Sequence, residues 1–404
     1  MLGGAALMAR RSRVAGLFAL LIGAWPFACN AQLAVTPHAA VDVEHNSNVF
    51  DLSSSGGAPI GKNGPTFADT TIESRAGFDG TYMLGRQSFF GAGEFRRFDY
   101  DNFSSLSHNE NTLNAGLIWK LERVLDGKVD YLHEQRMVQF MDLAASTNLI
   151  LETENKIRAS ANILLSPEWR LENNFKDRTL DSPRNDTPGL SLHEDSIHEA
   201  LRYLGVTNLA AGIDFDYLNG TYRHDPTALN PKYHQTSVAL AATYILSGLT
   251  NFNGSLGYTR RDDATYNGGQ SAVTGALGYK HSLTGKTSVD LELSRAVNSY
   301  VTTGGNELDT TAAASLAWQA TYKATVKLGY SWTNSKFSQS DINGLGSRVD
   351  HLQTTNAEVD YLVLRWLSIR TYVRYLSRSS TQGLYTFDGT VYGIEFLAKP
   401  DRRH

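Results

Sequence analysis

The sequence predicts an all-β fold, a transmembrane antiparallel up-and-down β-barrel of about 18 strands with short periplasmic turns and long extracellular loops. Three observations support this fold class. Apolar and polar side chains alternate with a period of two along many segments, short turns exchange regularly with long polar stretches, and no apolar run after the N-terminal region is long enough for a spanning helix. A soluble β-sandwich would show the same alternation in one hairpin, so the whole chain has to decide between the two.

The segment Asp309–Phe337 shows the alternation most clearly. In both of its halves apolar residues occupy every second position, which is the period of a strand with one apolar face. For the two apolar sets to share a face, the pattern predicts Trp318 opposite Ala324, joined by a three-residue turn, Ala320–Tyr322. This segment therefore predicts a β-hairpin.

The height of this hairpin fits a membrane. The eight steps of Ala324–Trp332 extend roughly 26 Å at ~3.3 Å per residue. Tilted by about 40°, the strand rises roughly 20 Å, close to the ~25 Å apolar band of an outer-membrane barrel. Trp318 and Trp332 then lie near the two edges of the band, where aromatic girdles are found.

The first 31 residues predict a signal peptide. Three arginines precede the short apolar run Val14–Phe27, and small residues lead to Ala31, after which we place cleavage. Cys29 offers a lipoprotein alternative, but Pro26-Phe27-Ala28 before it matches a lipobox poorly. The predicted organisation is a signal peptide over residues 1–31 and a single outer-membrane barrel domain over residues 32–404.

Composition narrows the function classes. The net charge of −4 is near neutral for 404 residues, so no nucleic-acid partner is implied. After the predicted cleavage no cysteine remains, which excludes disulfides, a thiolate metal site and a cysteine nucleophile. A mature chain of about 370 residues usually makes two soluble domains, but no linker divides this one. One large barrel explains the length better.

Strand and turn signals follow one another from the start of the mature chain. His38–His45 predicts a short strand, and the polar segment Asn46–Pro65 predicts a long loop. The next strand, Phe67–Leu84, meets Gln87–Tyr100 at the tight turn Gly85-Arg86. These residues show the pattern that the chain repeats, in which long loops and tight turns alternate between strands.

The same rhythm continues to the C-terminus. Further tight turns are predicted near Arg123–Gly127, Ser166-Pro167, Gly205–Asn208, Ser247–Thr250, Thr284–Lys286, Ala320–Tyr322 and Leu364–Trp366. Further long loops are predicted at Asp101–Asn109, Met141–Glu152, Asp181–Glu194, Tyr222–Tyr233, Arg261–Gln270, Asn298–Glu307, Ser338–Val349 and Arg378–Thr386. Nine long loops alternating with eight short turns imply about 18 strands with both ends on the short-turn side, and 16 strands is the alternative.

The polar faces of the strands predict a hydrophilic lumen. The charged residues expected to line it are Arg75, Asp79, Lys156, Arg158, Arg170, Glu172, Lys176, Asp214, Asp216, Asp290, Glu292, Lys327, Glu358, Asp360, Arg370 and Arg374. Both signs are mixed, whereas rings of one sign would indicate ion selectivity. Such a lumen suits water or sugar hydroxyls. The alternative is that these charges pair across strands and only support the barrel.

Catalytic and metal-binding patterns are weak, so we expect a non-enzymatic protein without a metal or a cofactor. The segment His193–His198 has histidines five apart, not the four that place two ligands on one helix face. His45 and Ser47 form a His–Ser pair like that of an outer-membrane lipase, but no second motif supports it, and no G-x-S-x-G motif is present.

Short motifs in the first third of the chain carry a family resemblance. They are Ala39–Phe50 (AAVDVEHNSNVF), Asp69-Thr70, Arg86–Phe98 (RQSFFGAGEFRRF), Asp99–Phe103 (DYDNF), Leu113–Trp119 (LNAGLIW) and Leu165–Leu171 (LSPEWRL). They resemble exosortase-associated outer-membrane β-barrels of exopolysaccharide biosynthesis operons, in the second β-barrel porin superfamily. This chain has His45 and Asn46 where acidic residues are common, so any role of those acids does not carry over.

The resemblance implies a part in extracellular polysaccharide biosynthesis or export, as a channel or accessory for polymer passage. The partners it implies are outer-membrane lipid, the polysaccharide and periplasmic polysaccharide export proteins, and we expect a monomer. Three alternatives remain: a general diffusion porin, an outer-membrane lipid hydrolase, and a structural barrel with a plugged lumen.

Overall fold

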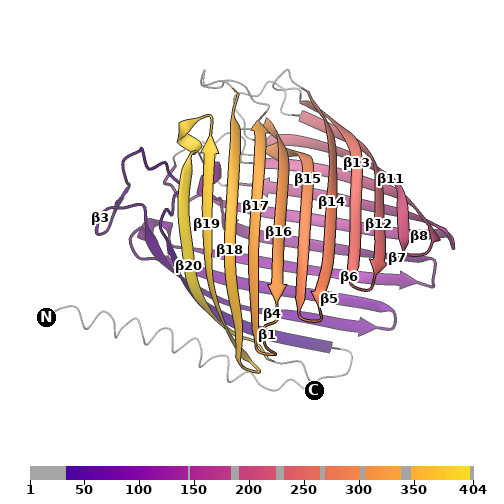
Figure 1. The fold of residues 1–404 in the computed structure, drawn as a ribbon, viewed down its shortest axis with the longest axis horizontal. Coiled ribbons are helices and arrows are strands. Elements are labelled where there is room, and N and C mark those ends of the chain that lie inside the picture. Colours follow the sequence, from indigo (N-terminus) through magenta and orange to yellow (C-terminus); the bar gives the residue numbers. More distant parts are fainter. Residues whose placement is uncertain are drawn as a thin grey trace.

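Eighteen antiparallel strands form one closed barrel (Figure 1). The computed structural model describes residues 33–143, 146–182, 191–223, 232–263, 269–300, 305–337 and 347–400. The predicted fold class and strand number are confirmed. The predicted signal peptide lies outside the described residues.

The barrel strands are 12 to 16 residues long. They are β1 (Leu33–Asn46), β4 (Asp69–Leu84), β5 (Gln87–Tyr100), β6 (His108–Leu121), β7 (Leu125–Met137), β8 (Leu151–Ser166), β9 (Trp169–Asp181), β10 (Ser191–Val206), β11 (Leu209–Arg223), β12 (Lys232–Ser247), β13 (Thr250–Asp263), β14 (Gln270–Thr284), β15 (Thr287–Tyr300), β16 (Gly305–Trp318), β17 (Ala324–Phe337), β18 (Val349–Leu364), β19 (Leu367–Ser380) and β20 (Phe387–Ala398).

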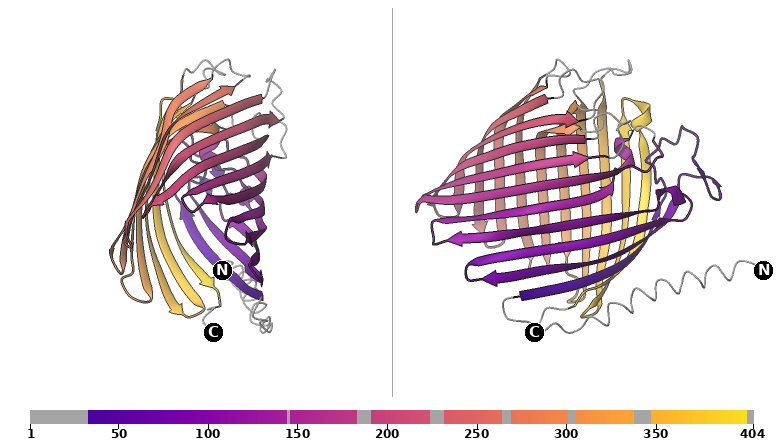
Figure 2. Two further views of the ribbon diagram at one scale, coloured as in Figure 1. Left: turned by 90° about the vertical axis from the view of Figure 1, so that its right-hand side faces the viewer. Right: turned by 180° about the vertical axis from the view of Figure 1, so that it is seen from behind.

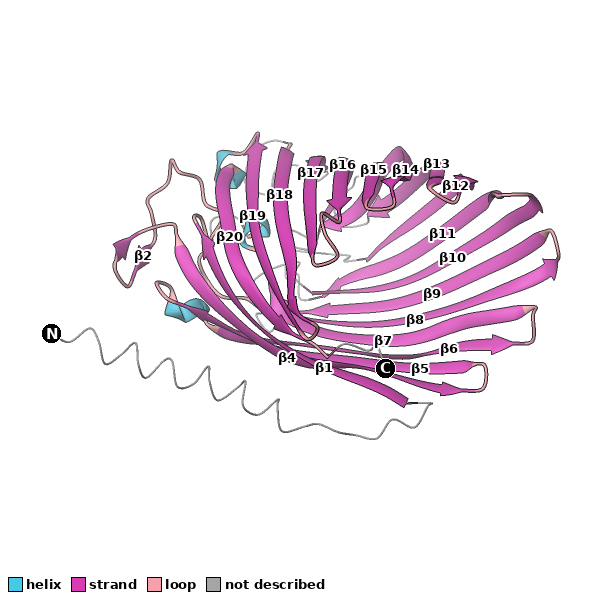
Figure 3. Ribbon diagram, turned by 60° about the horizontal axis from the view of Figure 1, so that its bottom comes forward, coloured by secondary structure: helices cyan, strands magenta, loops and turns pink. Residues whose placement is uncertain are grey.

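The remaining elements lie in the long connections. A small ladder joins β2 (Ile60–Gly61) to β3 (Gly64–Pro65). In the described residues, the short 3-10 helices, drawn in cyan in Figure 3, are Ser104–Leu106, Phe140–Asp142 and Gly383–Tyr385. They mark the end of the barrel that carries the long loops, here called the outer mouth because long loops of outer-membrane barrels face outward.

Each strand pairs with its neighbours in sequence, and β1 closes the barrel. The whole of β1 pairs with β4, and its second half, from Ala39 opposite Ala398 to Asn46 opposite Val391, pairs with β20. The barrel is flattened, and strands of the first half cross those of the second half steeply in the right-hand view of Figure 2. Because of this closure, no barrel strand lacks a hydrogen-bonded neighbour along a whole side.

The predicted hairpin forms, but its turn is longer than expected. Trp318 lies opposite Val326, not Ala324, so the connection runs over residues 319–323. The register differs by two residues, which keeps every side chain on its predicted face. The hydroxyl of Thr321 accepts hydrogen bonds from the backbone N–H groups of Lys323 and Ala324 (3.1 and 3.0 Å), which stabilises the wider turn.

Apolar side chains cover the outside of the barrel. Leu240, Leu256 and Leu277 are each more than 60% exposed, and similar side chains alternate along nearly every strand. Aromatic pairs such as Trp169–Tyr203 and Phe252–Tyr279 (ring centroids 5.0 and 4.9 Å apart) lie near the short turns, as an interfacial girdle requires. No helix in the described part of the chain is long and apolar enough to cross a membrane. A closed barrel with this outer surface is a bacterial outer-membrane protein.

Buried side chains concentrate at the outer mouth. One cluster joins the long connections through Phe50, Phe103 and Phe140, whose rings lie 4.7 and 4.9 Å apart. A second contains Tyr222 and Tyr233 together with leucines of β9 and β10. The barrel therefore has its densest packing at the end where the long loops lie.

Candidate channel interior and outer mouth

The sixteen predicted lumen residues all lie on barrel strands, at positions that alternate with the exposed apolar side chains. On β11, for example, Asp214 and Asp216 alternate with the exposed Ile213, Phe215 and Tyr217. The same holds on each strand that carries a predicted residue. The inner face of the barrel is consequently polar and charged.

A ladder of opposite charges crosses the closure of the barrel. Lys327 on β17 lies 2.7 Å from Glu358 and 2.8 Å from Asp360, both on β18. Arg370 on β19 binds Asp360 at 3.0 Å and approaches Glu395 on β20 at 3.8 Å.

The ladder ends on the far side of β1. Arg75 on β4 donates to the buried Glu395 across β1, where Ala40 lies opposite Arg75 and Asp42 lies opposite Glu395. Because these ion pairs link strands on both sides of β1, they support closure as well as lining the interior.

A second ladder runs along β7 to β10 near the outer mouth. Arg136 binds Glu152 at 2.8 Å, Arg178 binds Glu154 at 2.6 Å, and Arg178 also reaches Glu194 at 3.1 Å. Lys156 adds a 3.0 Å contact to Glu154. Other predicted residues pair locally: Arg158 with Asp130, Arg170 with Glu172, Asp214 with Arg202, Asp216 with His198, Asp290 with Lys280 and Asp79 with Lys399.

The second ladder ends in a buried polar cluster. Glu194 on β10 accepts hydrogen bonds from Tyr233 on β12 and from Ser299 on β15, both at 2.7 Å. Arg261 on β13 is 1% exposed, lies 3.9 Å from the centre of the Tyr233 ring, and donates to Ser299 and to Tyr222 (2.9 and 3.0 Å). These five residues, the mouth cluster, come from five strands.

A glycine permits the link between Glu194 and Tyr233. These two residues lie on either side of Gly220 on β11. A Cβ atom at Gly220 would lie 2.1 Å from the Tyr233 ring, so only glycine lets the ring cross β11. A larger residue here would break the mouth cluster at its centre.

A long connection reaches the mouth from another side. The buried Arg378 on β19 donates to the backbone carbonyl of Met141, which follows β7. Since β7 and β19 are not neighbours, this contact spans the mouth. Asp69 fixes a second connection by accepting hydrogen bonds from the backbone N–H groups of Asp101, Asn102 and Phe103 at 2.8 to 3.1 Å.

In the histidine segment that looked like a weak metal-binding motif, His193 lies next to two carboxylates. Asp177, His193 and Asp195 bring ligand atoms within 4.8 Å of one another, the sole such group of His, Cys, Asp and Glu in the described residues. They share the outer face of β9 and β10 with Phe175 and Ile197.

The His–Ser pair is not assembled as a catalytic pair. His45 Nδ1 lies 3.0 Å from the Thr70 hydroxyl, and Ser47 Oγ accepts the backbone N–H of Thr390 at 2.8 Å. Within the described residues no hydrogen bond links His45 to Ser47.

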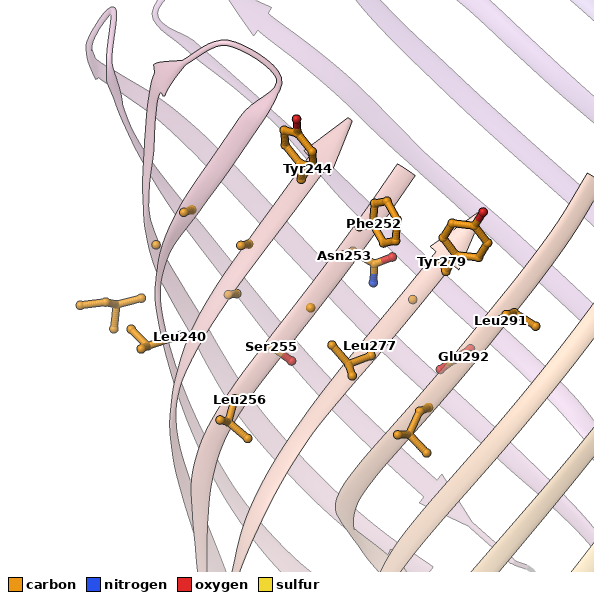
Figure 4. A pocket seen from close by; sticks show the side chains of 18 residues that line it. Leu240, Tyr244, Phe252, Asn253, Ser255, Leu256, Leu277, Tyr279, Leu291 and Glu292 are labelled. Carbon is orange, nitrogen blue, oxygen red and sulfur yellow. The ribbon is translucent and has the colours of Figure 1, made fainter. Parts of the chain in front are cut away.

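One hollow of the surface does not belong to the lumen. Its volume is 910 Å³, and leucines and aromatic rings of β11 to β15 line it, including Leu240, Leu256 and Leu277 (Figure 4). These side chains belong to the exposed outer face, so the hollow opens toward lipid.

The mouth cluster was not predicted from the sequence. Glu194, Tyr222, Tyr233 and Arg261 stand at the borders of segments predicted as loops, but the strands extend further and include them. Alternation could have placed Glu194 on the inner face with His198 and the even-numbered residues between them. Its partners could not be found in this way because they depend on contacts across the barrel.

No family model matches the chain, and no curated protein matches it. Among solved structures it is similar to the FrpB iron transporter from Neisseria meningitidis, with a TM-score of 0.47 and 11% identity over 89% of this chain and 63% of that one. It is also similar to OccAB3 from Acinetobacter baumannii, with a TM-score of 0.47 and 10% identity over 90% of this chain and 99% of that one. The outer membrane protein opdK from Pseudomonas aeruginosa gives a TM-score of 0.47 and 11% identity over 91% of this chain and 98% of that one. The chain thus spans less than two thirds of the FrpB structure.

Proposed function

We propose that this outer-membrane barrel is a channel, or the outer-membrane accessory of a channel, through which an extracellular polysaccharide leaves the cell. The observation that carries the proposal is the inner surface, where acids and bases of neighbouring strands neutralise one another. Such a surface offers many hydrogen-bonding groups without a ring of one charge sign. A hydroxyl-rich chain matches that chemistry better than a small ion does.

Two further features support an export role. An 18-stranded barrel is wide enough for an aqueous lumen, and the motifs of its first third resemble barrels of exopolysaccharide operons. Periplasmic export proteins are the partners proposed to deliver the polymer to the short-turn end.

Deletion of the gene tests the proposal. We expect loss of secreted polysaccharide, measured as cell-free hexose, with little change in the uptake of small sugars and antibiotics. Complementation with the wild-type gene should restore secretion. Normal secretion in the deletion strain would refute the export role.

A general diffusion porin is the second candidate, because a polar interior with paired charges also suits small solutes. It predicts the reverse result: slower uptake of small solutes and unchanged polysaccharide. The two measurements on one deletion strain therefore separate the candidates.

A further inference from the structure

β15 separates from β14 at the outer mouth. The β14–β15 ladder ends where Gly275 lies opposite Arg295, although both strands continue beyond that pair. Over the same stretch β15 stays paired with β16. The described arms of the β15–β16 hairpin beyond that ladder, Ala296–Tyr300 and Gly305–Asp309, are called the β15–β16 tip. Its residues Glu307–Asp309 stay paired with β17.

The outer face of this tip packs against the inner face of the wall. Val297 continues the face of the exposed Leu293, yet Val297 is only 6% exposed and clusters with Leu308 and Ala272. Ala272 lies on the inner face of β14, since the adjacent Val273 is 57% exposed on the outside. The tip therefore overlaps the inner face of β14, while its second arm stays beside β17.

Polar contacts hold the tip in this position. Ser299 of the tip donates to Glu194 and accepts from Arg261 (2.7 and 2.9 Å), and Tyr222 donates to the backbone carbonyl of Gly305 at 2.6 Å. The tip thus forms hydrogen bonds with β10, β11 and β13, which are not its neighbours in the wall. The mouth cluster thus links the tip to strands β10, β11 and β13 and acts as its latch.

The sequence also fits a second position for the tip. Extending the observed β14–β15 register would place Val273 opposite Val297 and Ala272 opposite Asn298. Val297 would then join Val273 on the lipid face, while Asn298 would face the lumen. The backbone groups of β14 that face β15 would gain ladder partners. Two packings of the same hairpin, one overlapping the inner face of β14 and one paired with the edge of β14, are a recognised form of structural switch.

We propose that the β15–β16 tip is the gate of the outer mouth, closed in this structure and open when the tip pairs with β14. This inference concerns the regulation of the proposed channel and rests on that function, but not on the identity of the molecule that passes. Opening exchanges the latch to Glu194 and Arg261 for strand pairing.

Two disulfide variants that share one position test the gate. The mature region lacks cysteine, because Cys29, the single cysteine of the sequence, precedes the predicted cleavage site. Ala272→Cys with Val297→Cys should lock the closed position, and Val273→Cys with Val297→Cys should lock the open one. Both proteins are oxidised, checked for folding by heat-modifiable gel mobility, and measured as ion conductance in planar bilayers before and after dithiothreitol.

We expect the closed lock to lose conductance and to regain the wild-type value on reduction. The open lock should exceed the wild-type conductance and fall back on reduction. Leu277→Cys with Leu293→Cys is the matched control, because these residues already pair on the same two strands outside the tip. That disulfide should form without changing conductance.

Two outcomes would overturn the gate. One is a measurable conductance that is equal for the two oxidised locks. The other is failure of the Val273–Val297 disulfide to form when the Leu277–Leu293 disulfide does. If both locks form and none of the proteins conducts, the movement of the tip is upheld and the channel function fails instead.

Discussion

At the scale of single residues, position on a strand decides whether a side chain contacts lipid or water. Leu328 on β17 is 49% exposed on the outer face, between Leu316 and Ala357 of the neighbouring strands. Leu328→Arg should cost about 2–4 kcal/mol of unfolding free energy if the residue lies near the bilayer midplane. Urea unfolding in lipid vesicles, followed by tryptophan fluorescence, measures this change.

The matched control lies on the same strand and the opposite face. Ser331 lies between Ala313 and Thr354, on the same face of β17 as the charged Lys327. Ser331→Arg should leave the unfolding free energy close to that of the wild type, because the charge stays in water. Equal destabilisation by both substitutions would contradict the assignment of the faces.

At the scale of elements, one carboxylate organises a whole connection. Asp69 is 1% exposed and accepts four backbone N–H groups, including those of Asp101, Asn102 and Phe103. Asp69→Ala removes the carboxylate that accepts all four hydrogen bonds, while the strands keep their own hydrogen bonds. When protease is added to intact cells, we expect it to cleave this variant within residues 101–107. Heat-modifiable gel mobility should show that the barrel itself is still folded.

The control for this element is Asp99→Ala. Asp99 is near the same connection but binds only the exposed Arg97 among its described hydrogen-bond partners. Protection of the connection in Asp99→Ala and cleavage in Asp69→Ala would assign the effect to the bonds of Asp69. A connection that resists protease in both variants would mean that the aromatic cluster around Phe103 suffices.

Element by element, local patterns were readable from the sequence and cross-barrel contacts were not. Alternation assigned β16 and β17 their correct faces, because the period of a strand is a property of adjacent residues. It missed the length of the turn between them, where a shift of two residues leaves the faces unchanged. It also gives Val297 a lipid-facing position, because only the separation of β15 from β14 turns this side chain inward.

At the scale of the whole molecule, the rhythm of turns and loops predicted the strand number, since every hairpin contributes two strands regardless of exact boundaries. The inner charges could be named from the same rhythm. Their pairing could not, because Arg75 reaches Glu395 only once β1 has closed the barrel between β4 and β20. The mouth cluster depends in the same way on residues far apart in sequence.

Closure itself can be tested by a disulfide. Val41 on β1 lies opposite Phe396 on β20, so Val41→Cys with Phe396→Cys should form a disulfide in the folded protein. Val41→Cys with Val373→Cys should not, because β20 separates β1 from β19 and strands lie about 4.8 Å apart. Mobility on non-reducing gels measures both. If the Val41–Phe396 disulfide fails to form while Val373→Cys with Tyr392→Cys, a pair inside the wall, does form one, the barrel is open at β1 and the ion pairs across that strand do not exist as described.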